Sequence, residues 1–245
     1  MDDGGSAGVV LSVIRTVAET GSTNDDVIAL AGAGAAEGTW LRAERQSAGR
    51  GRQGRAWTSP IGNFAGSTLV RLRPSDPPAP SLALVAAVAL YEAVAAFHPA
   101  SGLRLKWPND LLLDSAKLAG ILLERVDDAV VVGIGINLAH HPELPDRRTT
   151  SLAAQGTLVE VEPLAEALVA TFERWLGRWR DEGLLAIRSW WLERAHSPGT
   201  HLTARLPDGG RLEGAFDGLD AGGALILRLA SGERRVIHAG DVFLL

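Results

Sequence analysis

The chain has 245 residues, 46% of them hydrophobic and 22% charged, which is typical of a globular protein with a substantial core. Its net charge of −5 excludes a global basic field for DNA or an anionic membrane, so a positive site must be local. The lack of cysteine excludes disulfides, thiol catalysis and cysteine-ligated metals. The N-terminus has no signal-peptide pattern, and the apolar run 82–97 is too short to span a membrane, so we expect a cytoplasmic protein.

The first third of the chain alternates strand-like and irregular segments. Residues 9–17 are rich in β-branched side chains and predict a strand, and Asn24 is expected to cap a short helix over 25–32. Residues 39–44 and 64–72 also predict strands. Between these two strands, glycines break all periodicity, which predicts an irregular loop.

The middle of the chain predicts helices around a set of short strands. The proline-rich residues 73–80 predict a non-helical connector into a buried, alanine-rich helix over 81–97. Further helices are expected over 163–179, where Pro163 falls in the first turn, and over 183–195. The expected strands are 103–106, 110–113, 118–125 and 129–136. These elements predict an α+β fold, a mostly antiparallel sheet flanked by helices.

The composition changes after residues 196–200. Residues 199–245 are short strand-like runs separated by glycine-rich turns, which predicts a small β-barrel. A unit of that size is marginal by itself and should pack against the rest of the chain. We therefore expect a main domain over 1–198 and a C-terminal β domain over 199–245.

A loop over residues 46–55 carries the most chemical information. Arg50, Arg52 and Arg55 alternate there with three glycines. Glycine lets backbone N–H groups approach an anion closely, and guanidinium groups match phosphate and carboxylate oxygens in pairs. The loop therefore predicts a grip for a phosphorylated intermediate, although arginine-glycine loops also occur as solvated turns or RNA-binding segments.

A second cationic element follows in the run from Lys106 to Asp110 and in Lys117. Trp107-Pro108 predicts a fixed turn beside an aromatic surface, and Asn109 and Asp110 offer polar oxygens. Lys117 opens an otherwise apolar strand, where a single lysine usually extends its ammonium into water. Together with the arginine loop, it suggests two sources of positive charge around one anion.

Five short motifs occur in a fixed order between residues 21 and 137. They are Gly21–Asn24, Gln46 with Gly49–Arg55, Lys106–Asp110, Lys117–Ile121 and Gly133–Asn137. Each motif is weak evidence alone, but in this order they closely resemble the biotin–protein ligase family, within a resemblance that spans nearly the whole chain. The resemblance implies an ATP-dependent ligase that makes biotinyl-5′-AMP and transfers biotin to a lysine of a biotin carboxyl carrier protein. It also implies a biotin/lipoate ligase-like catalytic domain with a C-terminal SH3-like barrel.

The resemblance implies a role for each matching residue. The biotin-binding positions would be Ser22, Thr23, Asn24, Gln46, Arg50, Gly51, Arg52, Lys117 and Gly120. The nucleotide-binding positions would be Arg50, Arg52, Arg55, Trp57, Lys106, Asn109 and Asn137. Lys117, Arg52 and Asp110 would be catalytic, with Lys117 neutralising charge as the biotin carboxylate attacks the α-phosphate.

Mg²⁺ is expected to accompany ATP. The sequence shows no dedicated cation cage, so phosphates and water should hold most of its coordination sphere. Asp110 is the best protein candidate for a ligand, and its alternative role is to accept a hydrogen bond from the incoming carrier lysine. The glycine content of the arginine loop further predicts that it is mobile without ligand and becomes ordered on the adenylate.

The sequence departs from the family pattern at two positions. Ala65 stands where many relatives have tyrosine, so Trp40 or Trp57 is expected to rebuild that pocket wall. Gln53 stands where some relatives have arginine, which removes one positive charge from the loop. Neither change affects Lys117 or Arg52.

Other functional classes are less consistent with the sequence. A lipoate or octanoate ligase shares the fold but should lack the arginine loop together with the Lys106–Asp110 motif. A nucleic-acid-binding module would need a basic face, so no nucleic-acid or membrane partner is expected. Only about twenty residues precede Gly21, which favours a monofunctional ligase without an N-terminal DNA-binding domain. The sequence leaves monomer and homodimer open.

Overall fold

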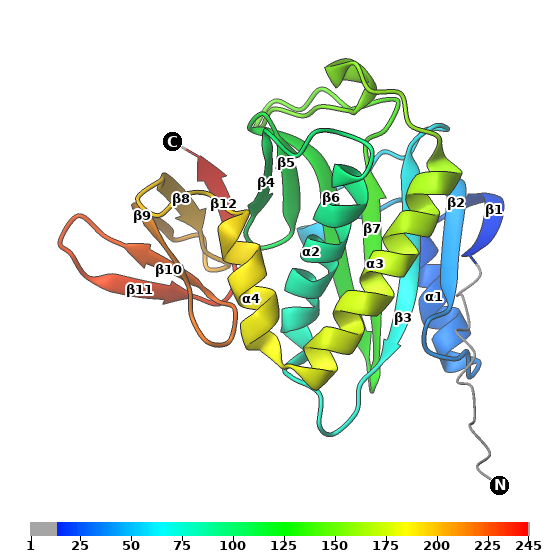
Figure 1. Ribbon diagram of the computed structural model, residues 1–245, viewed down its shortest axis with the longest axis horizontal. Coiled ribbons are helices and arrows are strands. Elements are labelled where there is room, and N and C mark those ends of the chain that lie inside the picture. Colours follow the sequence, from blue (N-terminus) through cyan, green and yellow to red (C-terminus); the bar gives the residue numbers. More distant parts are fainter. Residues whose placement is uncertain (1–13, 245) are drawn as a thin grey trace, which may run out of the picture.

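The computed structural model describes residues 14–244, and its largest element is a seven-stranded sheet (Figure 1). The strand order is β1-β2-β3-β7-β6-β5-β4. Its strands are β1 (Ile14–Thr20), β2 (Trp40–Gln46), β3 (Phe64–Arg71), β4 (Leu103–Lys106), β5 (Asp110–Leu113), β6 (Ala116–Val126) and β7 (Ala129–Ile136). The β1–β2 pair is parallel and the other pairs are antiparallel, so the expected mostly antiparallel sheet is confirmed.

Helices cover both faces of this sheet because its central strands are apolar on both sides. The alternation of β7 sends Val130 and Val132 into the larger core and Val131 into a smaller one. Three helices cover the larger core: α2 (Leu82–Ala95), α3 (Val161–Asp181) and α4 (Leu184–Glu193). On the opposite face, α1 (Thr23–Gly32) packs through Val27 and Ala31, which brings its N-terminal turn beside β3 and β7.

A second sheet forms the C-terminal part of the chain. Its strands are β8 (His201–Arg205), β9 (Arg211–Leu219), β10 (Leu225–Arg228), β11 (Arg234–Ile237) and β12 (Asp241–Leu244). They pair antiparallel in the order β11-β10-β9-β8-β12, as an open five-stranded sheet compatible with the expected SH3-like architecture. Trp107 Nε1 donates to the carbonyl of Gly223 at 3.1 Å, and Arg188 Nε donates to that of Leu219 at 3.0 Å. These bonds fasten the small sheet to the main one; the boundary at residue 198 stays a prediction.

The sequence predicts most elements, with three differences. Residues 9–13 of the first expected strand lie outside the described residues, and the strand continues to Thr20. Asn24 does not cap a helix, because the helix begins at Thr23 after Ser22 and tertiary partners take the buried Asn24 amide. The proline-rich connector contains a 3₁₀ turn, η2 (Ala79–Ser81), immediately before α2. Pro80 is compatible with a turn start, where its missing N–H has no helical partner.

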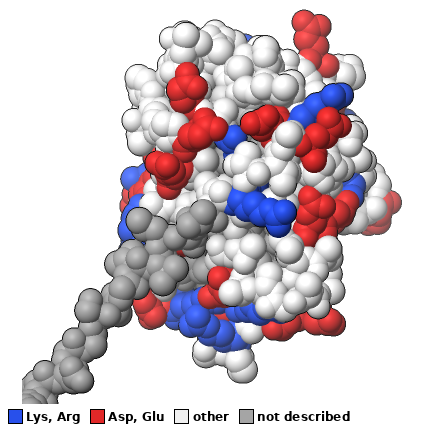
Figure 2. Space-filling view, turned by 90° about the vertical axis from the view of Figure 1, so that its right-hand side faces the viewer, with Lys and Arg blue, Asp and Glu red and all other residues white. Residues whose placement is uncertain are grey.

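Three of the four tryptophans of α3 and α4 lie in the core, and Trp190 is half-buried. Trp175, Trp179 and Trp191 are almost fully buried between the helices and the sheet. Within residues 14–244, no helix is long and apolar enough to cross a membrane. Figure 2 shows acidic and basic side chains interspersed on one face of the molecule, without a continuous basic patch there.

Candidate active site

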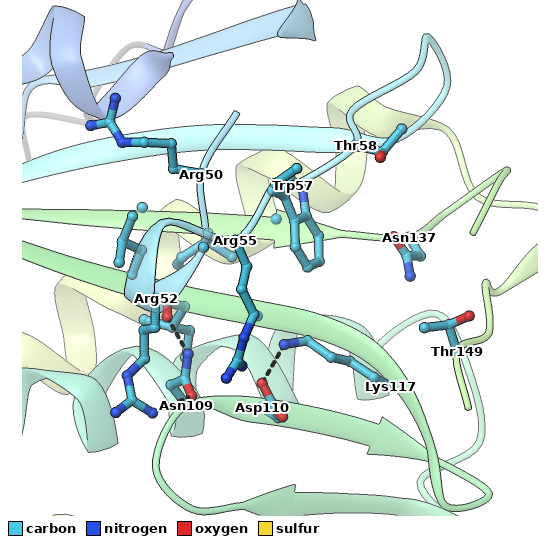
Figure 3. Close-up of a pocket in the computed structure, with 18 of the residues that line it drawn as sticks. Arg50, Arg52, Arg55, Trp57, Thr58, Asn109, Asp110, Lys117, Asn137 and Thr149 are labelled. Atoms are coloured by element: carbon cyan, nitrogen blue, oxygen red, sulfur yellow. Dashed lines mark hydrogen bonds and ion pairs between the residues drawn. The ribbon is translucent and has the colours of Figure 1, made fainter. Parts of the chain in front are cut away.

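A cavity of about 400 Å³ is lined by every site residue expected from the sequence (Figure 3). It lies between the N-terminal turn of α1, the arginine loop, the β4–β5 turn, β6, β7 and β12. Six cationic side chains and three carboxylates line it: Arg50, Arg52, Arg55, Lys106, Lys117 and Arg147, with Asp110, Asp146 and Asp241. The cavity is therefore a local positive site in a protein of net charge −5, as a site for an anionic ligand requires.

Glycines form the floor of the cavity. Gly120 on β6 pairs directly with Gly135 on β7, and Gly133 lies two residues before Gly135 on the same strand face. A Cβ atom on Gly133 would collide with the Asn24 amide, and one on Gly135 would collide with the Trp57 ring. The missing side chains thus let Asn24 and Trp57 lie flat on the sheet.

Polar side chains are gathered at the α1 end of the cavity. The Thr23 N–H donates to Gln46 Oε1 at 2.9 Å, and Gln46 Nε2 donates to Ser59 Oγ at 2.9 Å. Thr23 Oγ1 lies 2.7 Å from Ser67 Oγ, which donates to Asn24 Oδ1 at 2.6 Å. Because these groups are mutually bonded and, apart from the half-buried Gln46, buried, they form a preorganised set of donors and acceptors for a polar ligand head.

The arginine loop is held to α1 by Arg50. Its guanidinium donates to both carboxylate oxygens of Asp25 at 2.6 Å, and a further bond of 3.3 Å reaches Glu124 on β6. The hydrogen bond from Arg50 lowers the pKa of the Asp25 carboxyl. The guanidinium of Arg50 points away from Lys117 (Figure 3), so it tethers the loop while the loop backbone faces the cavity.

The far end of the loop contacts the C-terminal sheet. Arg52 donates to Asn109 Oδ1 at 3.3 Å and to the carbonyl of Gly240 at 3.1 Å. Arg55 forms an ion pair with Asp241 on β12. A single 3₁₀ turn, η1 (Arg52–Gly54), separates the two arginines and places them on the same side of the cavity.

Asp110 lies between two lysines at the centre of the site. Lys106 Nζ is 2.8 Å from Oδ2, and Lys117 Nζ is 2.5 Å from Oδ1. Burial alone would raise the pKa of Asp110, but the charges and hydrogen bonds of the two lysines outweigh it and hold the pKa well below its usual range. The carboxylate therefore stays ionised and fixes both ammonium groups. The Trp57 ring centroid lies 5.6 Å from Lys117 Nζ.

Asn137 marks the opposite end of the cavity from Arg50 (Figure 3). Its Nδ2 donates to the carbonyl of Thr150 at 3.0 Å, whereas its buried Oδ1 has no partner among the described residues. Asn63 Oδ1 accepts hydrogen bonds from three successive backbone N–H groups, 138–140, and so fixes the turn after β7. Burying Asn137 Oδ1 without a hydrogen-bond partner costs free energy, and a ligand that donates a hydrogen bond to this atom would remove that cost.

Trp57, and not Trp40, covers the position of Ala65. Ala65 pairs with Gly135 across β3 and β7, so both face the side on which the Trp57 ring lies. Trp40 packs edge-on against Phe172 in the core, with ring centroids 5.6 Å apart, and does not line the cavity. The expectation for Trp40 is wrong because the alternation of β2 turns its side chain to the opposite face of the sheet.

The cavity also contains residues to which the sequence analysis assigned no role. Asp241, Val242 and Phe243 come from β12, and a further set comes from the loop 142–149. Local pattern gives no signal for either, because only the tertiary fold brings them to the site. Gly133 and Gly135 did have a signal, the regular Gly-Ile-Gly-Ile run of β7.

Comparison with known proteins agrees with this architecture. The family model "Biotin/lipoate A/B protein ligase family" matches residues 23–139, and "Biotin protein ligase C terminal domain" matches 199–245. A biotin–[acetyl-CoA-carboxylase] ligase of Paracoccus denitrificans is 41% identical over 239 residues, covering 93% of this chain and 98% of its own length. The chain belongs to the biotin–protein ligase family. A ligase of the same name from Mycobacterium tuberculosis is 36% identical and covers 94% of this chain, which spans 88% of that relative.

Solved structures of biotin–protein ligases have the same fold. The Aquifex aeolicus enzyme in complex with biotin and ATP superposes with a TM-score of 0.83 at 25% identity, covering 95% of this chain and 99% of its own. The Leishmania major enzyme in complex with biotinyl-5-AMP has a TM-score of 0.65 at 26% identity, covering 92% and 98%. The expected fold class is therefore confirmed for this biotin–protein ligase, including its C-terminal module.

Proposed function

We propose that the chain activates biotin with ATP as biotinyl-5′-AMP and transfers biotin to a lysine of a biotin carboxyl carrier protein. In the first step, a biotin carboxylate oxygen attacks the α-phosphorus and pyrophosphate leaves. In the second, the carrier amine attacks the acyl carbon, loses a proton and displaces AMP. Neither step needs a covalent bond to the protein, so positioning and charge neutralisation account for catalysis.

The single observation that carries this proposal is the arrangement along one cavity. Bonded polar groups lie at the α1 end and the Lys106–Asp110–Lys117 cluster lies in the centre. At the other end lies the Asn137 acceptor, which has no partner within residues 14–244. A ligand in which a carboxylic acid with a polar head is joined through a phosphate to a nucleoside would place its polar head, its phosphate and its base beside these three groups in the same order.

At the polar end, Thr23, Asn24 and Gln46 would bond the ureido head of biotin, with Ser22 beside them at the start of α1. The glycine floor gives the bicyclic ring a flat surface, and the buried polar groups reject acids that lack a matching head. Gly51 and the neighbouring loop backbone would cover the acid from above.

At the centre, Lys117 would neutralise charge between the biotin carboxylate and the α-phosphate. Asp110 holds this ammonium in place and itself remains an anion. Lys106 lies on the other side of the same carboxylate, within reach of the phosphates. Arg52 and Arg55 would supply further phosphate contacts as the loop settles on the adenylate.

At the nucleotide end, Asn137 Oδ1 would accept a hydrogen bond from the adenine amino group. The atom is buried and free of partners in the described residues, as such a contact requires. Trp57 offers an aromatic face between this end and Lys117, and Asn109 lies beside Arg52. These assignments rest on position and on hydrogen-bonding capacity.

ATP would bind with Mg²⁺ on its phosphates. Residues 14–244 contain no group of three or more His, Cys, Asp or Glu that could hold a metal. Both oxygens of Asp110 are occupied by lysine ammonium groups, so the donor set does not fit a dedicated cation site. We therefore assign the cation to phosphates and water, with Asp110 acting on the lysines.

The carrier protein is the acceptor that we propose from the family. A second, smaller hollow shares Asp110 and Lys117 with the main cavity and is also lined by Arg147 and Phe243. It would offer the carrier lysine a route to the acyl carbon. ATP and carboxylase carrier domains are cytoplasmic substrates, which supports a cytoplasmic site of action.

The decisive experiment is biotin-dependent exchange of labelled pyrophosphate into ATP by the purified protein, with lipoate and octanoate as competing acids. Exchange with biotin alone is the expected result. Exchange with lipoate or octanoate would assign the chain to the lipoate side of the family, and no exchange with any acid would overturn the proposal.

A further inference from the structure

Glu124, near the outer end of β6, contacts both the first turn of α1 and the arginine loop. Its Oε2 accepts a hydrogen bond from Asn24 Nδ2 at 2.7 Å, and its Oε1 accepts one from Arg50 Nη2 at 3.3 Å. It does not line the cavity, so it does not touch a ligand there. One carboxylate thus bridges the first turn of α1 and the arginine loop.

The contact with Glu124 fixes the orientation of the Asn24 amide. Asn24 Oδ1 accepts from Ser67 Oγ at 2.6 Å while Nδ2 donates to Glu124 at 2.7 Å. An amide rotated by 180° would place Asn24 Oδ1 against the Glu124 carboxylate, acceptor against acceptor, whereas the Ser67 hydroxyl could accept from either orientation. One N–H and one lone pair of Asn24 remain for a ligand, and Glu124 decides in which directions they point.

The contact with Arg50 gives the glycine-rich loop a fixed point. The backbone around Arg50 bonds to the returning part of the same loop, with Gly51 N–H donating to the Arg55 carbonyl at 2.7 Å and Trp57 N–H to the Gly49 carbonyl at 2.8 Å. The Arg50 side chain ties this turn to α1 and β6. The Arg50 guanidinium spans Asp25 on α1 and Glu124 on β6. An exposed ion pair contributes little stability by itself. The bidentate contact with Asp25 together with the contact to Glu124 nevertheless restricts the Arg50 guanidinium to one orientation.

We propose that Glu124 is a positioning residue that couples biotin recognition to closure of the arginine loop. It orients the Asn24 amide toward the ureido head and tethers the loop through Arg50. Biotin binding and closure of the loop therefore favour each other. The inference rests on the proposed function. By thermodynamic linkage, a loop held by Arg50 raises biotin affinity by the same factor by which biotin favours the held loop.

Two substitutions of Glu124 separate its two contacts. Glu124→Ala removes both, so biotin should bind about tenfold more weakly and biotinyl-5′-AMP should dissociate about tenfold faster. Glu124→Gln keeps an acceptor for Asn24 but presents an amide N–H to Arg50. It should restore biotin affinity without ATP to within about threefold of wild type, while the adenylate still dissociates about tenfold faster.

Arg50→Ala gives an independent check of the same link. It should release the adenylate at least as fast as Glu124→Gln, because it removes the Asp25 pair as well as the Glu124 contact. Adding Glu124→Gln to Arg50→Ala should give no further increase, because the contact that it breaks is already absent. Glu166→Gln on α3, an exposed glutamate outside the cavity, is the matched control and should leave both measurements at wild-type values.

The measurements are biotin affinity by calorimetry without ATP and adenylate dissociation after rapid dilution. Absence of biotin-dependent pyrophosphate exchange in the wild type would refute the proposed function itself. With that exchange present, wild-type values for Glu124→Ala would overturn the coupling role. The coupling role would also be overturned if Glu124→Gln changed biotin affinity and adenylate dissociation as much as Glu124→Ala does. A purely structural role for Glu124 predicts that result, because it would not separate the effect on biotin affinity from the effect on adenylate dissociation.

Discussion

Lys117 Nζ and Asp110 Oδ1 lie 2.5 Å apart, and both side chains are largely buried. Lys106 approaches the other oxygen of the same carboxylate at 2.8 Å. Two ammonium groups around one carboxylate leave a net positive charge at the centre of the cavity. The carboxylate fixes the position of that charge before a ligand arrives, as a preorganised electrostatic site requires.

Lys117→Ala should lower the adenylation rate by about 10²–10³, comparable to the loss of one preorganised charge-stabilising donor. Pyrophosphate exchange measures this step directly. Arg125→Ala, an exposed cation on the same strand, is the control and should retain wild-type exchange. Wild-type exchange by the Lys117 variant would remove Lys117 from the reaction centre.

Arg52→Ala should weaken the hold on the adenylate rather than its formation. The side chain contacts Asn109 and the Gly240 carbonyl at the cavity edge, from where it can reach a phosphate. Dissociation of biotinyl-5′-AMP should become about tenfold faster, consistent with the loss of one charged hydrogen bond. Arg45→Ala, exposed just before the loop and outside the cavity, should leave the release rate unchanged. Unchanged release in the Arg52 variant would exclude this role.

The arginine loop should become resistant to protease when the adenylate forms. Its glycines favour mobility without ligand, although Arg50, Arg52 and Arg55 all have partners in the structure. Limited trypsin digestion should cut after these arginines in the free protein, and biotin plus ATP should suppress the cuts. Cutting that biotin plus ATP does not slow would contradict an ordering loop.

Sequence pattern predicts the elements whose signals are local. The strands 103–106 and 110–113 occur in the structure with those bounds. The first alternates leucine with cationic residues, the second has three leucines after Asp110, and the Trp-Pro turn separates them. The buried helix α2 also has a local signal: its alanine-rich sequence favours a helix, and its composition, apolar apart from Glu92, favours burial.

Sequence pattern does not predict side-chain contacts between residues that are far apart in the chain. Asn24 has a high propensity to cap helices, but the buried amide bonds instead to Glu124, one hundred residues further along the chain. Arg55 pairs with Asp241, which lies 186 residues away. No local rule encodes either contact, so motifs located the site while its supporting residues required the fold.

The glycine floor predicts separate effects for two similar substitutions. Gly133→Ala should displace the Asn24 amide and raise the KM for biotin, whereas Gly135→Ala should displace Trp57 and weaken nucleotide binding. Steady-state kinetics with each substrate varied in turn will distinguish them. Overpacking a close contact costs about 1–3 kcal/mol, which corresponds to roughly tenfold or more in affinity.

Gly177→Ala on α3 is the control for the floor variants. Its added Cβ meets nothing within 4 Å, so activity should be unchanged. Stability should rise by about 0.5–1 kcal/mol, because alanine is the better helix former. Equal kinetic changes in Gly133→Ala and Gly135→Ala would argue against two distinct subsites on the floor.

His196, at the junction of the two sheets, should make the protein sensitive to mild acid. Burial, followed by the charges of Lys106 and Arg104, lowers the pKa of His196 to about 4. Its buried Nε2 has no partner among the described residues, so nothing stabilises the protonated ring. As the pH falls below the ordinary histidine pKa of about 6.5, the unfolded chain takes up a proton that the folded chain does not. The part of the folding stability that depends on neutral His196 is therefore fully present above about pH 6.5 and is progressively lost toward pH 4.

Replacing His196 with leucine should remove this contribution to the pH dependence. Urea unfolding at pH 7 and pH 5 measures it: the midpoint should fall between the two pH values by more in the wild type than in His196→Leu. His140→Gln, an exposed histidine, should show the wild-type difference. An equal midpoint difference in the wild type and His196→Leu would show that the buried imidazole does not contribute. The comparison holds even if leucine shifts the absolute stability, because only the change between pH values is compared.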